Sequence, residues 1–162
     1  MAYEQNLFPY TKNFKLNFIK IALVIIVLSV FGVSLAYEAI VVQKMEEKIV
    51  QPSMNFFLMG STAILGGGVL EWIIWLANPI SLVSIVMFLY NDTQLKKASL
   101  LSLIALILSS SFYLWKEILV SESGATGKII SFENGYYLWV ASIFILFVFQ
   151  LMYYKSNEII KT

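Results

Sequence analysis

With 162 residues the chain has the length of a single domain, but 59% of its residues are hydrophobic and only 13% are charged, whereas soluble domains average about 25% charged residues. This composition argues against an ordinary soluble domain and favours an integral membrane protein. The formal net charge of +1 gives no field that would attract nucleic acid, and the lack of any Cys or His excludes disulfides, Cys- or His-ligated metals and Ser-His-Asp catalysis.

The first long apolar stretch covers residues 18–42. A membrane-spanning helix needs about 20 mainly apolar residues, and this stretch has no charged residue between Lys20 and Glu38. We therefore predict a span over residues 18–42. Within it, Gly32 and Ala36 form a pair of small residues that allows another helix to approach closely, either inside the monomer or across a homodimer.

The next apolar region, residues 56–90, contains a single charged residue, Glu71. The region is too long for one span and too short for two spans with a turn between them. The glycine triplet 66–68 has poor helix propensity, so we divide the region there. The prediction is an interfacial or re-entrant segment over residues 53–66 and a span over residues 69–90.

Two further spans are predicted over residues 98–119 and 135–154. The expected fold class is an all-α membrane protein, a four-transmembrane-helix bundle with a short interfacial or re-entrant segment in the first outer loop. The whole chain, residues 1–162, would form one integral membrane domain. Four spans place more lysines on the inner side than on the outer side, as the positive-inside rule requires when the N-terminus is cytoplasmic. The inner lysines are Lys12, Lys15, Lys20, Lys96, Lys97, Lys155 and Lys161, and the outer lysines are Lys44, Lys48, Lys116 and Lys128.

Glu71 is the most informative polar residue inside an apolar run. On a helix, Glu71, Trp75 and Asn78 are spaced by four and three residues and share one face. Pro79 has no backbone donor and frees the carbonyl of Trp75, which favours a bend there. Polar groups at membrane depth must be satisfied internally, so we expect this face to point into the bundle.

Polar residues of the later spans are expected at the same depth. Ser109, Tyr113 and either Lys116 or Glu117 form a stripe at helical spacing, and Lys116 is placed to pair with Glu71. Three interpretations stay open. In the first, these groups form a hydrogen-bonded clasp between helix ends. In the second, Glu71, Trp75, Asn78, Tyr113, Lys116 and Trp139 line an outward-facing site for a ligand or a proton. In the third, Glu71 only extends its carboxylate to water from the end of its span.

The four tryptophans, Trp72, Trp75, Trp115 and Trp139, all fall near the outer ends of the predicted spans. Indoles gather at the headgroup level of membranes, so an aromatic belt is one interpretation. The alternative is that some of them turn inward and line a cavity.

Two patterns in the last outer loop resemble functional motifs without fitting them. The stretch "SGATGKII" lacks the first glycine and the final Ser or Thr of a phosphate-binding loop, and we expect a turn at a hairpin tip instead. The carboxylates Glu117, Glu122 and Glu133 are interpreted as solvated loop charge.

Three stretches, "WLANPISL", "SFYLWKEIL" and "GYYLWVAS", resemble in order and spacing a type of small four-span bacterial inner-membrane protein without assigned activity. The likeness covers roughly residues 66–150. It implies four helices with an elaborated first outer loop and carries over no catalytic residue.

These observations favour a non-enzymatic membrane protein, an accessory or interaction subunit of a larger membrane complex. The alternative is a small transporter or a membrane protein that binds a lipid or small molecule at the polar site around Glu71. No cofactor, metal or nucleic acid is expected. The expected partners are the lipid bilayer and either another membrane protein or a second copy of the chain. The expected location is the inner (plasma) membrane, with both termini cytoplasmic.

Overall fold

The computed structural model describes residues 8–90, 92–120 and 125–161. Long helices dominate it: α1 (Phe8–Leu35), α4 (Ala77–Tyr90) preceded by the short α3 (Val69–Trp75), α5 (Leu95–Ser111) and α6 (Asn134–Lys161). In the described residues, four helical segments are long and apolar enough to cross a membrane: Phe18–Leu35, Val69–Tyr90, Leu95–Leu114 and Asn134–Ser156. The number of predicted spans and their order along the chain agree with these segments.

The outer surface of these helices is apolar. Only 22% of the first segment is buried, and Ile25, Leu82, Ile107 and Phe144, one from each segment, are all more than half exposed. A soluble monomer rarely exposes continuous apolar surface of this extent, whereas lipid tails cover it at no cost. The arrangement therefore supports a multi-pass membrane protein.

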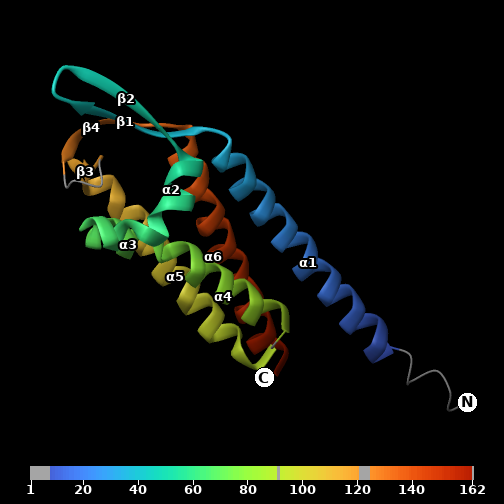
Figure 1. The fold of residues 1–162 in the computed structure, drawn as a ribbon. Coiled ribbons are helices and arrows are strands. Elements are labelled where there is room, and N and C mark those ends of the chain that lie inside the picture. Colours follow the sequence, from blue (N-terminus) through green and yellow to red (C-terminus); the bar gives the residue numbers. More distant parts are fainter. Residues whose placement is uncertain (1–7, 91, 121–124, 162) are drawn as a thin grey trace, which may run out of the picture.

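A four-stranded sheet lies across one end of the helices (Figure 1). Its strands are β1 (Glu38–Lys44), β2 (Glu47–Pro52), β3 (Glu117–Leu119) and β4 (Thr126–Phe132), in the order β2-β1-β4-β3 with antiparallel neighbours. The all-α prediction is wrong in this part. Successive side chains of a strand point to opposite faces of a sheet. Ile40 and Val42 of β1 are fully buried below the sheet, whereas Gln43, the next residue, is exposed.

The sheet also shortens two predicted spans. The span predicted over residues 18–42 ends as a helix at Leu35, and residues 39–42 belong to β1. The span predicted over residues 98–119 starts earlier, at Leu95, and its last residues form β3. Apolar, β-branched residues suit a buried strand as well as a helix. The prediction from hydropathy therefore extended both helices past their real C-terminal ends.

The segment predicted as interfacial or re-entrant consists of α2 (Ser53–Met59) and the 3₁₀ helix η1 (Gly60–Gly66). Gly67 ends η1 in the left-handed conformation at φ +86°, and its N–H bonds back to the carbonyl of Ile64. A left-handed cap is natural for glycine, so the triplet does interrupt the helix as predicted. Its depth in a membrane remains a prediction.

The long helices pack side by side, with α5 between α4 and α6 and α1 against α6, and both apolar and polar side chains join them. The hydroxyl of Ser84 lies 2.8 Å from the carbonyl of Ala98 and 2.9 Å from Oε1 of Gln150, which joins α4, α5 and α6. By contrast, a Cβ at Gly32 would meet nothing within 4 Å. Packing within the monomer therefore does not explain this glycine, and the homodimer interpretation stays a prediction.

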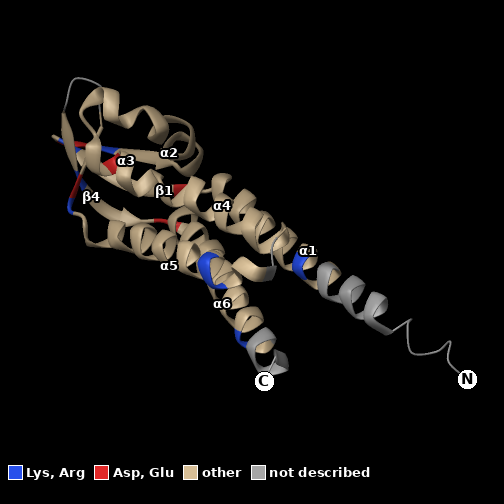
Figure 2. Ribbon diagram, turned by 90° about the horizontal axis from the view of Figure 1, so that it is seen from below, with Lys and Arg blue, Asp and Glu red and all other residues tan. Residues whose placement is uncertain are grey.

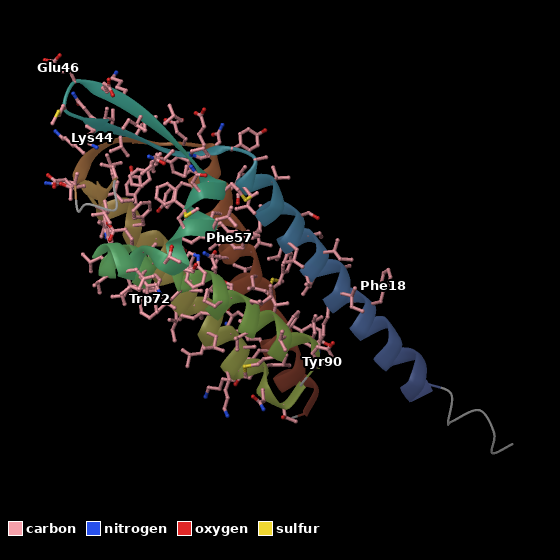
Figure 3. The ribbon with its side chains drawn as sticks, in the orientation of Figure 1. Phe18, Lys44, Glu46, Phe57, Trp72 and Tyr90 are labelled. Carbon is pink, nitrogen blue, oxygen red and sulfur yellow. The ribbon has the colours of Figure 1, made fainter. Side chains whose placement is uncertain are left out.

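Charge separates the two ends of the molecule (Figure 2). The sheet end carries both signs, and Lys44 and Glu46 lie together at the tip of the β1–β2 hairpin, far from Phe18 and Tyr90 (Figure 3). At the opposite end, the described charged side chains are all lysines: Lys20, Lys96, Lys97 and Lys155. Lys20 is buried, with its ammonium 5.3 Å from the ring centre of Phe88 and 4.9 Å from that of Tyr153.

Candidate functional site: a cavity beneath the sheet

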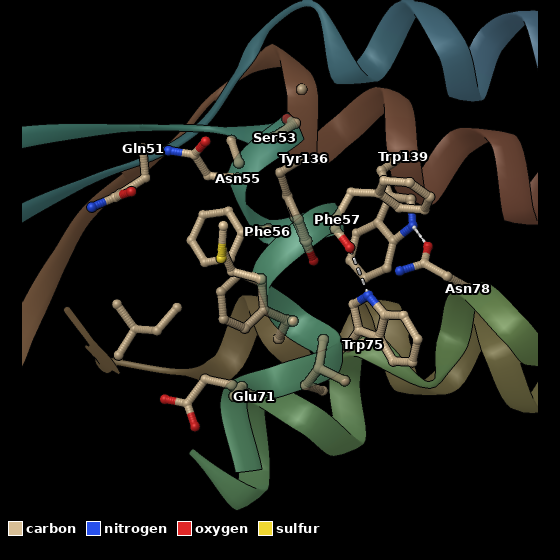
Figure 4. A pocket seen from close by; sticks show the side chains of 18 of the residues that line it. Gln51, Ser53, Asn55, Phe56, Phe57, Glu71, Trp75, Asn78, Tyr136 and Trp139 are labelled. Carbon is tan, nitrogen blue, oxygen red and sulfur yellow. Dashed lines mark hydrogen bonds between the residues drawn. The ribbon is translucent and has the colours of Figure 1, made fainter. Parts of the chain in front are cut away.

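A cavity of about 780 Å³ lies at the sheet end, enclosed by the sheet, α2, η1, α3 and the ends of the long helices (Figure 4). Its volume falls in the range of about 300–1,000 Å³ that is usual for small-molecule sites. Of the residues predicted from the sequence as a site, Glu71, Trp75, Asn78 and Trp139 line it.

Glycines shape the cavity wall. A Cβ at Gly60 would collide with the indole of Trp75, so glycine at this position allows the ring to lie flat against the backbone of η1. The indole N–H of Trp75 then donates to the carbonyl of Phe57 at 2.9 Å. The glycines that weaken the helix in this part of the chain therefore also allow α2 and η1 to lie over the start of α3.

Glu71 lies in the first turn of α3 and reaches the sheet. Its Oε1 accepts a hydrogen bond of 2.9 Å from the backbone N–H of Leu119 in β3. Lys116 is exposed, does not line the cavity and forms no ion pair with Glu71. The predicted clasp between Glu71 and Lys116 is therefore not formed, and the partner of Glu71 is a backbone amide of β3 that sequence spacing cannot reveal.

Asn78 and Trp139 form the opposite wall. The indole N–H of Trp139 on α6 donates to Oδ1 of Asn78 on α4 at 2.9 Å (Figure 4). The helix that carries Glu71 and Asn78 is interrupted at Leu76, between α3 and α4, close to the bend predicted from Pro79. Glu71 and Asn78 thus line the same cavity, but they lie apart and make separate contacts.

Two of the four tryptophans turn inward, because the N–H groups of Trp75 and Trp139 both donate to protein acceptors beside the cavity. Trp115 packs edge-on against Phe112, with 5.4 Å between ring centres. Trp72 points away from the sheet on α3 (Figure 3). An aromatic belt does not describe this arrangement, since most of these rings have internal partners.

Tyr113 lies outside the cavity. It is exposed, and its ring leans on Phe132 at 5.2 Å between centres. The predicted stripe through Ser109, Tyr113 and Lys116 required a continuous helix, but α5 ends at Ser111 and the chain becomes extended at Trp115. Tyr136 lines the cavity instead, and its hydroxyl donates to the carbonyl of Ser109 at 3.2 Å.

Among the polar lining residues that were missed from the sequence, Gln51, Ser53 and Asn55 come from one short stretch of the chain. The Oγ of Ser53 is buried and has no hydrogen-bond partner among the described residues. Neither the Gln51 nor the Asn55 amide is bonded within that part of the chain, and both lie beside Ser53 (Figure 4). Their signal was the short polar run "QPSMN" between a β-branched stretch and an apolar one.

The described residues between α5 and α6 bring no second group of functional side chains together. Gly127 of the phosphate-loop-like stretch lies buried in β4 opposite Ile118, and residues 121–124, with Glu122 and the expected hairpin tip, lie outside the described residues. The carboxylates of Glu117 and Glu133 accept hydrogen bonds from separate hydroxyls, those of Thr126 and Ser131. Across the described ranges, no three His, Cys, Asp or Glu residues gather in a way that could hold a metal ion.

Comparisons with protein-family models, with curated proteins and with solved structures found no match to this chain.

Proposed function

We propose that the protein is a non-enzymatic membrane protein that binds an amphipathic small molecule or lipid in the cavity beneath the sheet. The cavity itself carries this proposal. Its volume of about 780 Å³ accommodates a drug-sized molecule, and it combines aromatic walls with a few polar groups. Of the two functions expected from the sequence, the geometry favours the binding protein.

An amphipathic ligand suits the lining. One wall consists of the aromatic rings of Phe56, Phe112 and Tyr136, which are part of the apolar cluster below the sheet. The buried Oγ of Ser53, which has no hydrogen-bond partner among the described residues, lies at the sheet side, and the exposed Asn55 lies beside it. A molecule with a polar head and an apolar body would satisfy both regions, because a buried polar group without a partner costs about 1–3 kcal/mol.

The charge distribution supports an outward-facing cavity. The end opposite the sheet carries Lys96, Lys97 and Lys155, which the positive-inside rule places in the cytoplasm. Both termini are then cytoplasmic and the sheet lies outside the inner membrane.

Native mass spectrometry of gently extracted protein tests the binding function. We expect the wild-type protein to retain a small molecule or lipid, and the variant Ala63→Trp to lose it, because Ala63 lines the cavity. The matched control is Ile107→Trp, which adds the same indole on the lipid-facing surface of α5. Equal retention by both variants would contradict the proposal.

The β1–β2 hairpin favours a second candidate, the accessory subunit of a membrane complex. The hairpin extends past the helices (Figure 1), and Met45 at its tip is 90% exposed. If it contacts a partner protein, a stoichiometric partner seen by native mass spectrometry should dissociate from the variant Met45→Asp. It should remain bound to Tyr90→Asp, which alters an equally exposed residue at the other end.

A further inference from the structure

The cavity has an unbalanced charge. Among the described residues that line it, Glu71 is the only charged one, and none is a lysine. The hydrogen bond from the Leu119 amide engages Oε1, while Oε2 accepts no hydrogen bond within the described part of the chain. A carboxylate at the edge of an apolar space, with one oxygen unbonded and no cation beside it, attracts positive charge and repels anions.

The walls of the cavity suit a cation as well. Phe56, Phe57, Trp75, Phe112, Tyr136 and Trp139 all contribute aromatic rings. The faces of such rings attract ammonium-type cations within about 6 Å of the ring centre, and more strongly where water is excluded. The chain uses this chemistry elsewhere, since the buried ammonium of Lys20 lies over the rings of Phe88 and Tyr153.

We infer that the ligand is a lipophilic cation, an ammonium or similar onium group attached to an apolar body. Its charged group lies near Oε2 of Glu71 and its body lies against the aromatic walls. This inference rests on the proposed binding function and adds the charge of the ligand. Anionic lipids are disfavoured, because their headgroups would meet Glu71 without any basic residue in the lining to offset it.

Two nearly isosteric probes of opposite charge test the inference: tetraphenylphosphonium and tetraphenylborate, with triphenylphosphine oxide as a neutral comparison. Binding to the purified full-length protein in neutral detergent is followed by tryptophan fluorescence, since Trp75 and Trp139 line the cavity. We expect the phosphonium to bind at least tenfold more tightly than the borate, a difference of about 1.4 kcal/mol. Ala63→Trp should abolish the binding of the phosphonium.

The variant Glu71→Gln keeps a carbonyl oxygen for the Leu119 amide and removes only the charge. It should weaken phosphonium binding about tenfold and leave the neutral probe within a factor of two. The matched control is Glu117→Gln, a carboxylate at the same end of the molecule that does not line the cavity; it should change neither affinity.

The outcomes separate the inference from the proposed function. If the neutral probe or the borate binds as tightly as the phosphonium and Ala63→Trp blocks it, the cavity binds ligands but the cationic class is wrong. If no probe binds and no molecule is retained on extraction, the binding function itself fails. If Glu71→Gln does not fold, the comparison of the two charged probes on the wild-type protein decides.

Discussion

Gly135, the second residue of α6, lies where the helix meets both the sheet and α2. A Cβ built there would lie 2.6 Å from the carbonyl oxygen of Glu38 and would also collide with Oγ of Ser53. We expect Gly135→Ala to lower the free energy of unfolding by about 1–3 kcal/mol, the usual cost of overpacking. Thermal unfolding in detergent measures the change.

Gly32 provides the control for this prediction, because a Cβ there meets nothing within 4 Å. Alanine is favoured over glycine inside a helix by about 0.5–1 kcal/mol. Gly32→Ala should therefore leave the melting temperature unchanged or raise it. Equal losses in both variants would mean that the close contact at Gly135 is not present in the folded protein.

The hydrogen bond between Trp139 and Asn78 joins α6 to α4 at the cavity wall. Asn78→Ala leaves the indole N–H unpaired, and Trp139→Phe removes the donor, so the two changes should not be additive. A double-mutant cycle on the free energy of unfolding in mixed micelles should give a coupling of about 0.5–1.5 kcal/mol, as other hydrogen bonds between membrane helices do. A coupling near zero would place the two groups out of contact.

At the scale of elements, the central strand pair of the sheet joins two loops that lie far apart in the sequence. Gln43 of β1 and Lys128 of β4 are register partners, and antiparallel partners lie about 4.5–5.5 Å apart between Cα atoms, within reach of a disulfide. Since the chain has no cysteine, we expect Gln43→Cys with Lys128→Cys to form a disulfide under mild oxidation. To detect the disulfide, the chain is cleaved between residues 43 and 128. On a non-reducing gel the two fragments then migrate together only if the disulfide has formed.

The control for this cross-link uses the other neighbour of β1. Lys48 of β2 also pairs with Gln43, but from the opposite side. Lys48 and Lys128 are therefore two strand spacings apart, about 9.6 Å, which is beyond disulfide reach. If Lys48→Cys with Lys128→Cys oxidises as readily as the first pair, the strand order is different.

The long helices could be predicted from the sequence because each is a long, mainly apolar run, and a run of that length predicts a membrane-spanning helix. The sheet could not. Residues 39–42 and 118–119 are apolar, and only Glu38 in the first case and Lys116 and Glu117 in the second separate them from the apolar runs before them, so hydropathy extends the helix over them. Their strand state depends on pairing with β4, a contact between distant parts of the sequence that local periodicity does not record.

The candidate site was predicted in part for a similar reason. The shared face of Glu71, Trp75 and Asn78 follows from helical spacing, and all three line the cavity. Lys116 and Tyr113 were placed beside them by extending α5 past its real end. Ser53 was missed, because its place in the cavity depends on how the segment between α1 and α3 folds and not on any pattern of its own.

For the whole molecule, the orientation in the membrane is the decisive prediction. Met45 at the hairpin tip is 90% exposed, and Lys96 is exposed at the start of α5, at the opposite end. In intact cells, a membrane-impermeant maleimide should label Met45→Cys at once and Lys96→Cys only after permeabilisation. Labelling of both from one side would rule out a single crossing between Met45 and Lys96, and with it the four-span topology.

The position of β1 in the middle of the sheet also sets an order of assembly. β1 follows the first long helix, whereas its partner β4 directly precedes the last one. Because synthesis runs from the N-terminus, β1 and β2 are made while β4 does not yet exist. One edge of β1 then keeps its backbone groups unpaired until nearly the whole chain has been made. A truncated chain therefore exposes an open strand edge, to which another extended segment can bind by strand addition.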